Sequence, residues 1–326
     1  MSPVSGLQKL SLADEILGHL PLVDKTAVWG TLGTIRPHLS FEVEKDVQAL
    51  LKAVSGKGVA YGTIIDLLTN RSNKQRQQIA EEFLDFTKQD LLKTLEAAVS
   101  GNLEGVIVGL LRPAAQYDAH EINVALKVEP SVHTYFHSDL EKDVASGTSD
   151  CFHDLLVALI KGNRERYPGV IDYVLIRQDT KALVGTGGSD PGSLDDSEWI
   201  RILTQRSHEH LNRVFRRYHE MTGFQIEEAM AKILQGKAQE AGLTLVSVLR
   251  NTPLYFATKL YQAVKGPVAS PRTLARILIS RSETDLLSIR AEFRKHYGIS
   301  LYSFIRAETN GNYQAALLGL CRAEDL

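Results

Sequence analysis

The stretch Thr273–Gly298, TLARILISRSETDLLSIRAEFRKHYG, decides the fold because related stretches occur earlier in the chain. Shifting its numbering back by 75 or by 210 residues brings it onto two other segments. Five of its positions, Arg281, Ser282, Leu286, Ile289 and Phe293, fall on Arg206, Ser207, Leu211, Val214 and Tyr218 at the first shift and on Arg71, Ser72, Arg76, Ile79 and Phe83 at the second. A single offset that aligns many residues indicates one supersecondary unit, copied and packed against itself.

The spacing of apolar residues inside this stretch predicts two helices. Apolar residues from Leu274 to Leu278 keep helical spacing up to Arg281, which we expect to bond the free carbonyls of that helix end. The sequence Ser282–Asp285 fits a capping box, with Asp where Glu is commoner, and opens a second helix. Similar patterns predict five helices in about 75 residues and no clear strand, so the protein is predicted to be all-α.

Composition points to a soluble globular protein. The 326 residues are 44% hydrophobic and carry a formal net charge of −2, which argues against disorder and against a nucleic-acid partner. No apolar run approaches the ~20 residues that a membrane span requires, and the N-terminus lacks a secretory signal. Cys151 and Cys321 lie in apolar helical stretches and are expected to be buried free thiols. We therefore expect a cytoplasmic protein.

The repeat divides the chain into an N-terminal tail and four units. The expected boundaries are 1–40 for the tail, 41–113, 114–166, 167–250 with a linker, and 251–326. Within the tail, residues 11–20 predict a short helix with one apolar face. Two interpretations of this helix stay open: it folds back onto its own domain, or it docks into the groove of a protein partner.

The second unit is shorter than the others. Asp139–Val144 matches Ser300–Arg306 at an offset of 161, but only 12 residues separate Lys127 from Leu140, whereas 35 separate Lys265 from Leu301. About one and a half helices, or 23 residues, are therefore missing. Either the chain is a real shortened variant or its gene model is faulty. In both cases the loss is expected to expose apolar faces of neighbouring helices.

Taken together, these features resemble the annexins over about residues 41–326. The resemblance is carried by the helix ends LLTNR (67–71), ILTQR (202–206) and ILISR (277–281), by SETDLLSIRAEFRKHYGISLYSFI (282–305) and by the closing LLGLCRAEDL. It implies an array of four five-helix repeats in a curved disc. It also implies that one face binds acidic phospholipid through calcium, held in the loop between the first and second helices of each repeat.

The calcium sites implied by the resemblance are incomplete in this sequence. Calcium requires six to eight oxygen ligands, and the family pattern combines Lys/Arg-Gly-x-Gly-Thr with a carboxylate about 40 residues after the second glycine. The first loop keeps Gly56 and Gly58, but Ala98 stands at the carboxylate position. The fourth loop keeps Gly266 and Glu308 but loses the second glycine. Gly266 and Glu308 form the best residual pair.

The implied calcium sites of the second and third repeats keep fewer of the expected ligand residues. The second loop falls in the missing segment, and its carboxylate position is Gly147. The third loop is rewritten around Gly192–Asp196, and its carboxylate position is Ile233. Asp195 and Asp196 fit either a residual ligand pair or an acidic helix start. Any calcium binding is therefore expected to be weak.

Without calcium, attraction to a membrane depends on basic side chains. Lys57, Lys265 and Arg272 lie in or beside the loops of the lipid-facing side that the resemblance implies. Each such charge contributes ~1 kcal/mol near an acidic leaflet, so the three predict weak, salt-sensitive binding. The alternative interpretation is that they are ordinary surface charges. We thus expect a peripheral phosphatidylserine-binding protein with weak or lost calcium dependence. The alternative is a protein-interaction scaffold that acts through residues 11–20 or the second repeat.

An enzyme is the weakest hypothesis. Ser207-His-Glu-His210 places two histidines near a glutamate, but residues two apart on a helix face different ways. The spacing His-Glu-x-x-His of a zinc protease does not occur. We therefore interpret this segment as a solvated helix start and expect a protein without catalytic activity.

Overall fold

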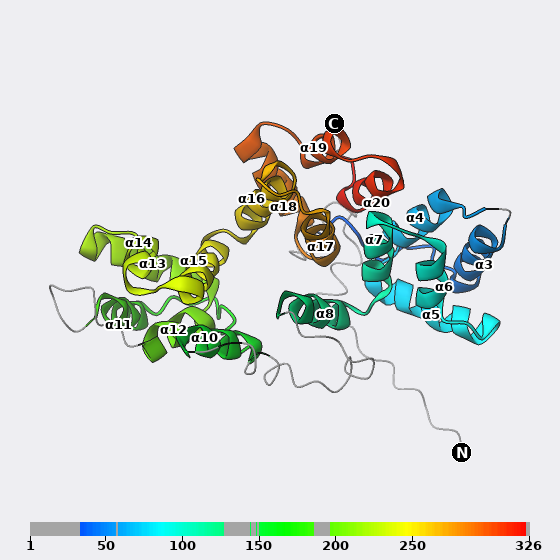
Figure 1. Cartoon of the computed structure of the whole chain (residues 1–326). Helices are drawn as coiled ribbons and strands as arrows, with labels where there is room; N and C mark the ends of the chain where they lie inside the picture. Colours follow the sequence, from blue (N-terminus) through cyan, green and yellow to red (C-terminus); the bar gives the residue numbers. More distant parts are fainter. Residues whose placement is uncertain are drawn as a thin grey trace, which may run out of the picture. The chain divides into compact units, whose positions relative to one another are not determined.

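The computed structural model describes residues 33–56, 58–126, 144, 148, 150–185 and 196–323. These residues form seventeen helices and no strand, which confirms the all-α prediction (Figure 1). Within them, no helix combines the length and apolar character needed to cross a bilayer. The tail helix predicted at 11–20, and Lys57, lie outside the described residues.

The helices divide into two compact units. Unit 1 combines Met1–Arg112 with Lys259–Leu326, and unit 2 is Pro113–Thr258. The first and fourth repeats, which are farthest apart in the chain, thus share one unit. Each unit is described here by itself.

Unit 1 contains a complete five-helix repeat from each end of the chain. The first repeat supplies α3 (Val43–Ser55), α4 (Tyr61–Thr69), α5 (Asn73–Thr87), α6 (Leu91–Ala98) and α7 (Asn102–Leu111). The fourth supplies the C-terminal part of α16 (Thr252–Lys265), α17 (Pro271–Arg281), α18 (Leu286–Tyr297), α19 (Leu301–Glu308) and α20 (Gly311–Cys321).

The two repeats of unit 1 pack on each other reciprocally. The last helix of each repeat lies against the second helix of the other, α20 on α4 and α7 on α17 (Figure 1). The α20–α4 crossing is close, because a Cβ atom at Gly319 would lie 2.7 Å from Thr69 Oγ1. Arg322 strengthens the contact by donating hydrogen bonds to Thr69 O at 3.1 Å and to Asn70 Oδ1 at 2.7 Å.

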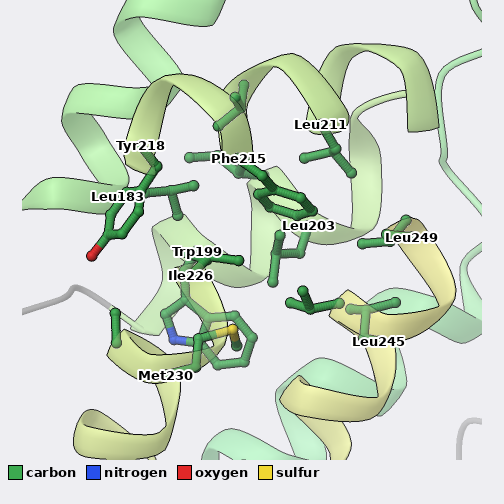
Figure 2. Close-up of a cluster of buried hydrophobic side chains, with 14 of the residues drawn as sticks. Leu183, Trp199, Leu203, Leu211, Phe215, Tyr218, Ile226, Met230, Leu245 and Leu249 are labelled. Atoms are coloured by element: carbon green, nitrogen blue, oxygen red, sulfur yellow. The ribbon is translucent and has the colours of Figure 1, made fainter. Parts of the chain in front are cut away.

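Unit 2 holds the second and third repeats. Its helices are α8 (Ala114–Leu126), α10 (Asp150–Ile160), α11 (Tyr173–Val184), α12 (Asp196–Gln205), α13 (His208–Thr222), α14 (Ile226–Ile233) and α15 (Gly236–Arg250). Their core is a buried cluster in which Leu211, Phe215 and Tyr218 of α13 face Trp199 and other apolar side chains (Figure 2). These three residues lie three, four and seven positions apart on α13 and therefore share a face, which explains the helical spacing of this repeat.

Reciprocal packing is incomplete among the described helices of unit 2. The last helix of the second repeat, α10, packs on the second helix of the third repeat, α12. Among the described residues, no second helix of the second repeat packs against α15, which is the last helix of the third repeat. Thr244 of α15, which corresponds to Gly319 at the shift of 75, is exposed. The shortened second repeat itself stays a prediction, since its stretch lies outside the described residues.

The predicted capping box at Ser282–Asp285 does not form. Ser282 ends α17, and its Oγ donates to Ile279 O at 2.9 Å instead of capping α18. The Asp285 carboxylate accepts two bonds from Arg281, at 2.8 and 2.6 Å, so it is not available as a cap. Arg281 accordingly binds the carboxylate of Asp285. The box does form at the corresponding position of the first repeat, where Ser72 caps α5.

Candidate functional site

The loop between α16 and α17 folds tightly against the end of α16. Gly266 N donates to Gln262 O at 2.8 Å, and Ser270 N donates to Ala263 O at 2.8 Å. A Cβ atom at position 266 would lie only 2.4 Å from Gln262 O. The loop therefore requires glycine at this position for steric reasons.

A second set of bonds holds this loop beside the turn between α19 and α20. Tyr313 Oη donates to Pro271 O, the first residue of α17, at 2.8 Å. Burial raises the pKa of Tyr313 to about 12, so the hydroxyl remains a donor throughout the physiological range. Gln314 bonds the carbonyl of Thr309 and, at 2.9 Å, that of Arg306. The loop and the C-terminal end of α19 are thus brought together.

Lys265 and Glu308 meet at this junction. Lys265 Nζ lies 2.7 Å from Glu308 Oε1, with the two side chains 45% and 28% exposed. The carboxylate predicted as a metal ligand and a lysine predicted to face the membrane therefore contact each other. The ammonium group occupies the oxygen that a divalent cation at this loop would need.

The outer part of the loop is apolar. Pro267, Val268 and Ala269 are exposed, and Val268 is 79% exposed. Arg272, the third predicted membrane-facing residue, is also exposed at the start of α17. Sequence reasoning did not single out Val268, although an apolar residue between Pro and Ala in a predicted surface loop was the signal available.

The loop between α3 and α4 is closed by a corresponding backbone hydrogen bond, but it does not require glycine for steric reasons. Ala60 N donates to Ala53 O at 2.9 Å, as Ser270 does to Ala263 in the fourth repeat. Gly56 has a φ of −75°, which any residue adopts, and a Cβ atom at Gly58 would meet nothing within 4 Å. Both glycines are therefore present without a steric need for them.

The carboxylate positions of the other repeats supply no ligand. Ala98 is the last residue of α6 and is half-buried, and Ile233 is the last residue of α14. Gly147 and the segment 186–195, which includes Asp195, lie outside the described residues. Asp196 is the first residue of α12.

The described residues do not fit a tight calcium site. They contain no group of three or more histidine, cysteine, aspartate or glutamate side chains close enough to hold a metal ion. The fourth loop has one carboxylate, Glu308, and a lysine already contacts it. Calcium prefers at least six oxygens and a bidentate carboxylate, so this arrangement favours little affinity.

The histidine segment has a structural role in unit 2. The segment starts a helix as predicted, and Ser207 caps α13, with its Oγ accepting a bond from His210 N at 3.3 Å. His210 is not solvated, however: its side chain is 11% exposed and its Nε2 lies 2.8 Å from Asp179 Oδ2. The same oxygen lies 2.7 Å from Arg206 Nε. Burial alone would raise the pKa of Asp179, but these partners outweigh it and hold the pKa below its usual value.

Comparison with known proteins agrees with the repeat. The family model described as Annexin matches residues 45–110, 189–245 and 255–320, leaving 111–188 unmatched. Annexin A9 of Mus musculus is 49% identical over 349 aligned positions, and annexin A9 of Homo sapiens is 48% identical, each covering 100% of both chains. Since this chain has 326 residues, at least 23 aligned positions contain none of its residues.

The fold agrees as well. The solved structure of annexin III superposes with a TM-score of 0.85 at 33% identity, covering 91% of this chain and 98% of that one. Chicken annexin V superposes with a TM-score of 0.77 at 36% identity, covering 90% and 100%. The chain therefore belongs to the annexin family.

Proposed function

We propose that this annexin is a peripheral phospholipid-binding protein that associates with acidic, phosphatidylserine-containing membranes at their cytoplasmic face with little or no dependence on calcium. The observation that carries the proposal is the ion pair of Lys265 with Glu308. A protein cation stands at the carboxylate where a calcium ion would be needed, so added calcium must compete with a covalently tethered charge.

The remaining attraction comes from the loop surface. Lys265 and Arg272 are basic, and Val268 presents an apolar side chain beside them. At ~1 kcal/mol for each basic side chain near an acidic leaflet, such a surface supports weak binding only. Salt screens the attraction between these charges and the membrane, with a Debye length of ~8 Å at physiological ionic strength. Binding is therefore expected to weaken as the salt concentration rises.

Co-sedimentation with vesicles tests the proposal. We expect binding to phosphatidylserine vesicles in EDTA at low ionic strength, loss of binding as salt is added, and little change on adding micromolar calcium. Vesicles of phosphatidylcholine alone are the control and should not bind. Strict dependence on micromolar calcium would contradict the proposal.

The missing residues belong to the same proposal. We propose that the 23 residues are absent from the second repeat, where they would form the calcium loop, the helix after it and part of the next helix. The family model leaves 111–188 unmatched, and the relatives have at least 23 positions more in the alignment. Sequencing the transcript distinguishes a shortened variant from a faulty gene model.

A further inference from the structure

The net charge of the Lys265–Glu308 ion pair determines how strongly an acidic membrane attracts it. Its net charge is zero, so an acidic surface attracts the intact pair only weakly. Lysine has three N–H donors, and Glu308 Oε1 takes one of them at 2.7 Å. Because the Lys265 side chain is 45% exposed, the other donors can reach a ligand from solvent.

We propose that Lys265 is the cation of a headgroup-phosphate site in the α16–α17 loop, and that Glu308 competes with the phosphate for it. The inference rests on the proposed function. When Lys265 turns to a phosphate, Glu308 loses its partner while the anionic surface approaches. Glu308 therefore weakens membrane binding, and its charge sets how much lipid negative charge is needed to open the pair.

The apolar tip of the loop identifies the source of the phosphate as a lipid. Val268 lies three residues after Lys265 and is 79% exposed. An exposed valine gains from contact with a bilayer, whereas a soluble phosphate offers it nothing. The loop thus combines a cation with an apolar side chain, as membrane-surface segments do.

A double-mutant cycle on vesicle binding tests this competition. Partition coefficients onto phosphatidylserine–phosphatidylcholine vesicles are measured in EDTA for wild type, Glu308→Gln, Lys265→Gln and the double variant. We expect Glu308→Gln to bind about fivefold more tightly, the equivalent of one unpaired basic charge. In the Lys265→Gln background the same change should strengthen binding only by the general electrostatic gain of removing one negative charge, because there is no ammonium to release.

Glu292 provides the matched control. It lies on α18 in the same unit, and Lys295 Nζ is 3.7 Å from its Oε1, so Glu292→Gln removes an equal charge away from the loop. The change in vesicle binding caused by Glu292→Gln measures the effect of removing one negative charge outside the proposed site. Lys265→Arg should retain binding and confirm that the charge is what matters, and thermal unfolding by circular dichroism verifies that each variant is folded.

Each outcome decides one of the two proposals. If Glu308→Gln strengthens binding equally with and without Lys265, the competition is wrong while phospholipid binding stands. If neither wild type nor any variant sediments with the vesicles, the proposed function fails. Val268→Asn should weaken vesicle binding severalfold; full displacement from vesicles by inorganic phosphate at the same salt would instead assign the site to a soluble anion.

Discussion

In each complete repeat, an arginine stands at the end of the second helix. The residue at one position of the first helix determines which carboxylate this arginine pairs with. Arg71 pairs with Asp46 of α3, at 2.6 Å, and Arg206 pairs with Asp179 of α11, at 2.7 Å. In the fourth repeat, Phe256 stands at the position of Asp46, and Arg281 turns to Asp285 in its own loop instead. Asp285, which is bonded to Arg281, makes no side-chain capping bond to α18.

Replacing Asp179 should destabilise unit 2 by about 3 kcal/mol, because Arg206 would keep its charge in a nearly buried site with only the exposed Glu165 beside it, and His210 would lose its carboxylate partner. Urea unfolding of Asp179→Asn measures the loss. Glu198→Gln is the control, since Glu198 is more exposed and its pair with Arg201 should contribute less than about 1 kcal/mol.

The same carboxylate predicts a direction of pH dependence. The pKa of Asp179 is held below its usual value in the folded protein, so the unfolded state binds a proton more readily. Its stabilisation is present above the ordinary value of 3.8 and is lost as pH falls through the folded pKa. Asp179→Asn should flatten the acid limb of unfolding measured against pH, and an unchanged limb would contradict this assignment.

Tyr313 predicts a pH dependence of folding stability on the alkaline side. Its pKa rises from 10.0 to about 12 on folding, so the folded state retains the proton more strongly. The contribution of this hydroxyl to stability is full below pH 10 and declines between pH 10 and about 12. The difference between wild type and Tyr313→Phe in alkaline unfolding should show this decline, and a difference independent of pH would refute it.

At the scale of elements, a close helix crossing defines the reciprocal packing of unit 1. Gly319→Ala should destabilise unit 1 by about 1–3 kcal/mol, because the new Cβ would approach Thr69 Cβ to 3.0 Å and force α20 away from α4. Thr244→Ala, at the corresponding position of α15, is exposed and should change the free energy of unfolding by less than about 0.5 kcal/mol. Equal effects at both positions would show that the crossing is not a constraint.

At the scale of the whole molecule, the proposed loss of 23 residues from the second repeat predicts unequal stability of the two units. Inserting the 23 residues of the mouse relative between Lys127 and Leu140 should raise the unfolding midpoint of unit 2 by several degrees, since about 1 kcal/mol shifts a domain of this size by roughly 2–4 °C. Calorimetry should leave the transition of unit 1 unchanged. No gain in unit 2 would contradict a loss of helices there.

The sequence by itself determined the all-α fold and the repeat, because helical periodicity and turn residues act over a few neighbouring positions. It also indicated which loops had lost their carboxylates. It left the candidate site divided: Gly266 and Glu308 were identified as a residual calcium pair, and Lys265 was identified separately as a membrane-facing cation. Only tertiary structure decided that Lys265 neutralises Glu308, that His210 is buried against Asp179, and that the first and fourth repeats share a unit. These depend on contacts between residues 31 to more than 200 positions apart, which local patterns do not specify.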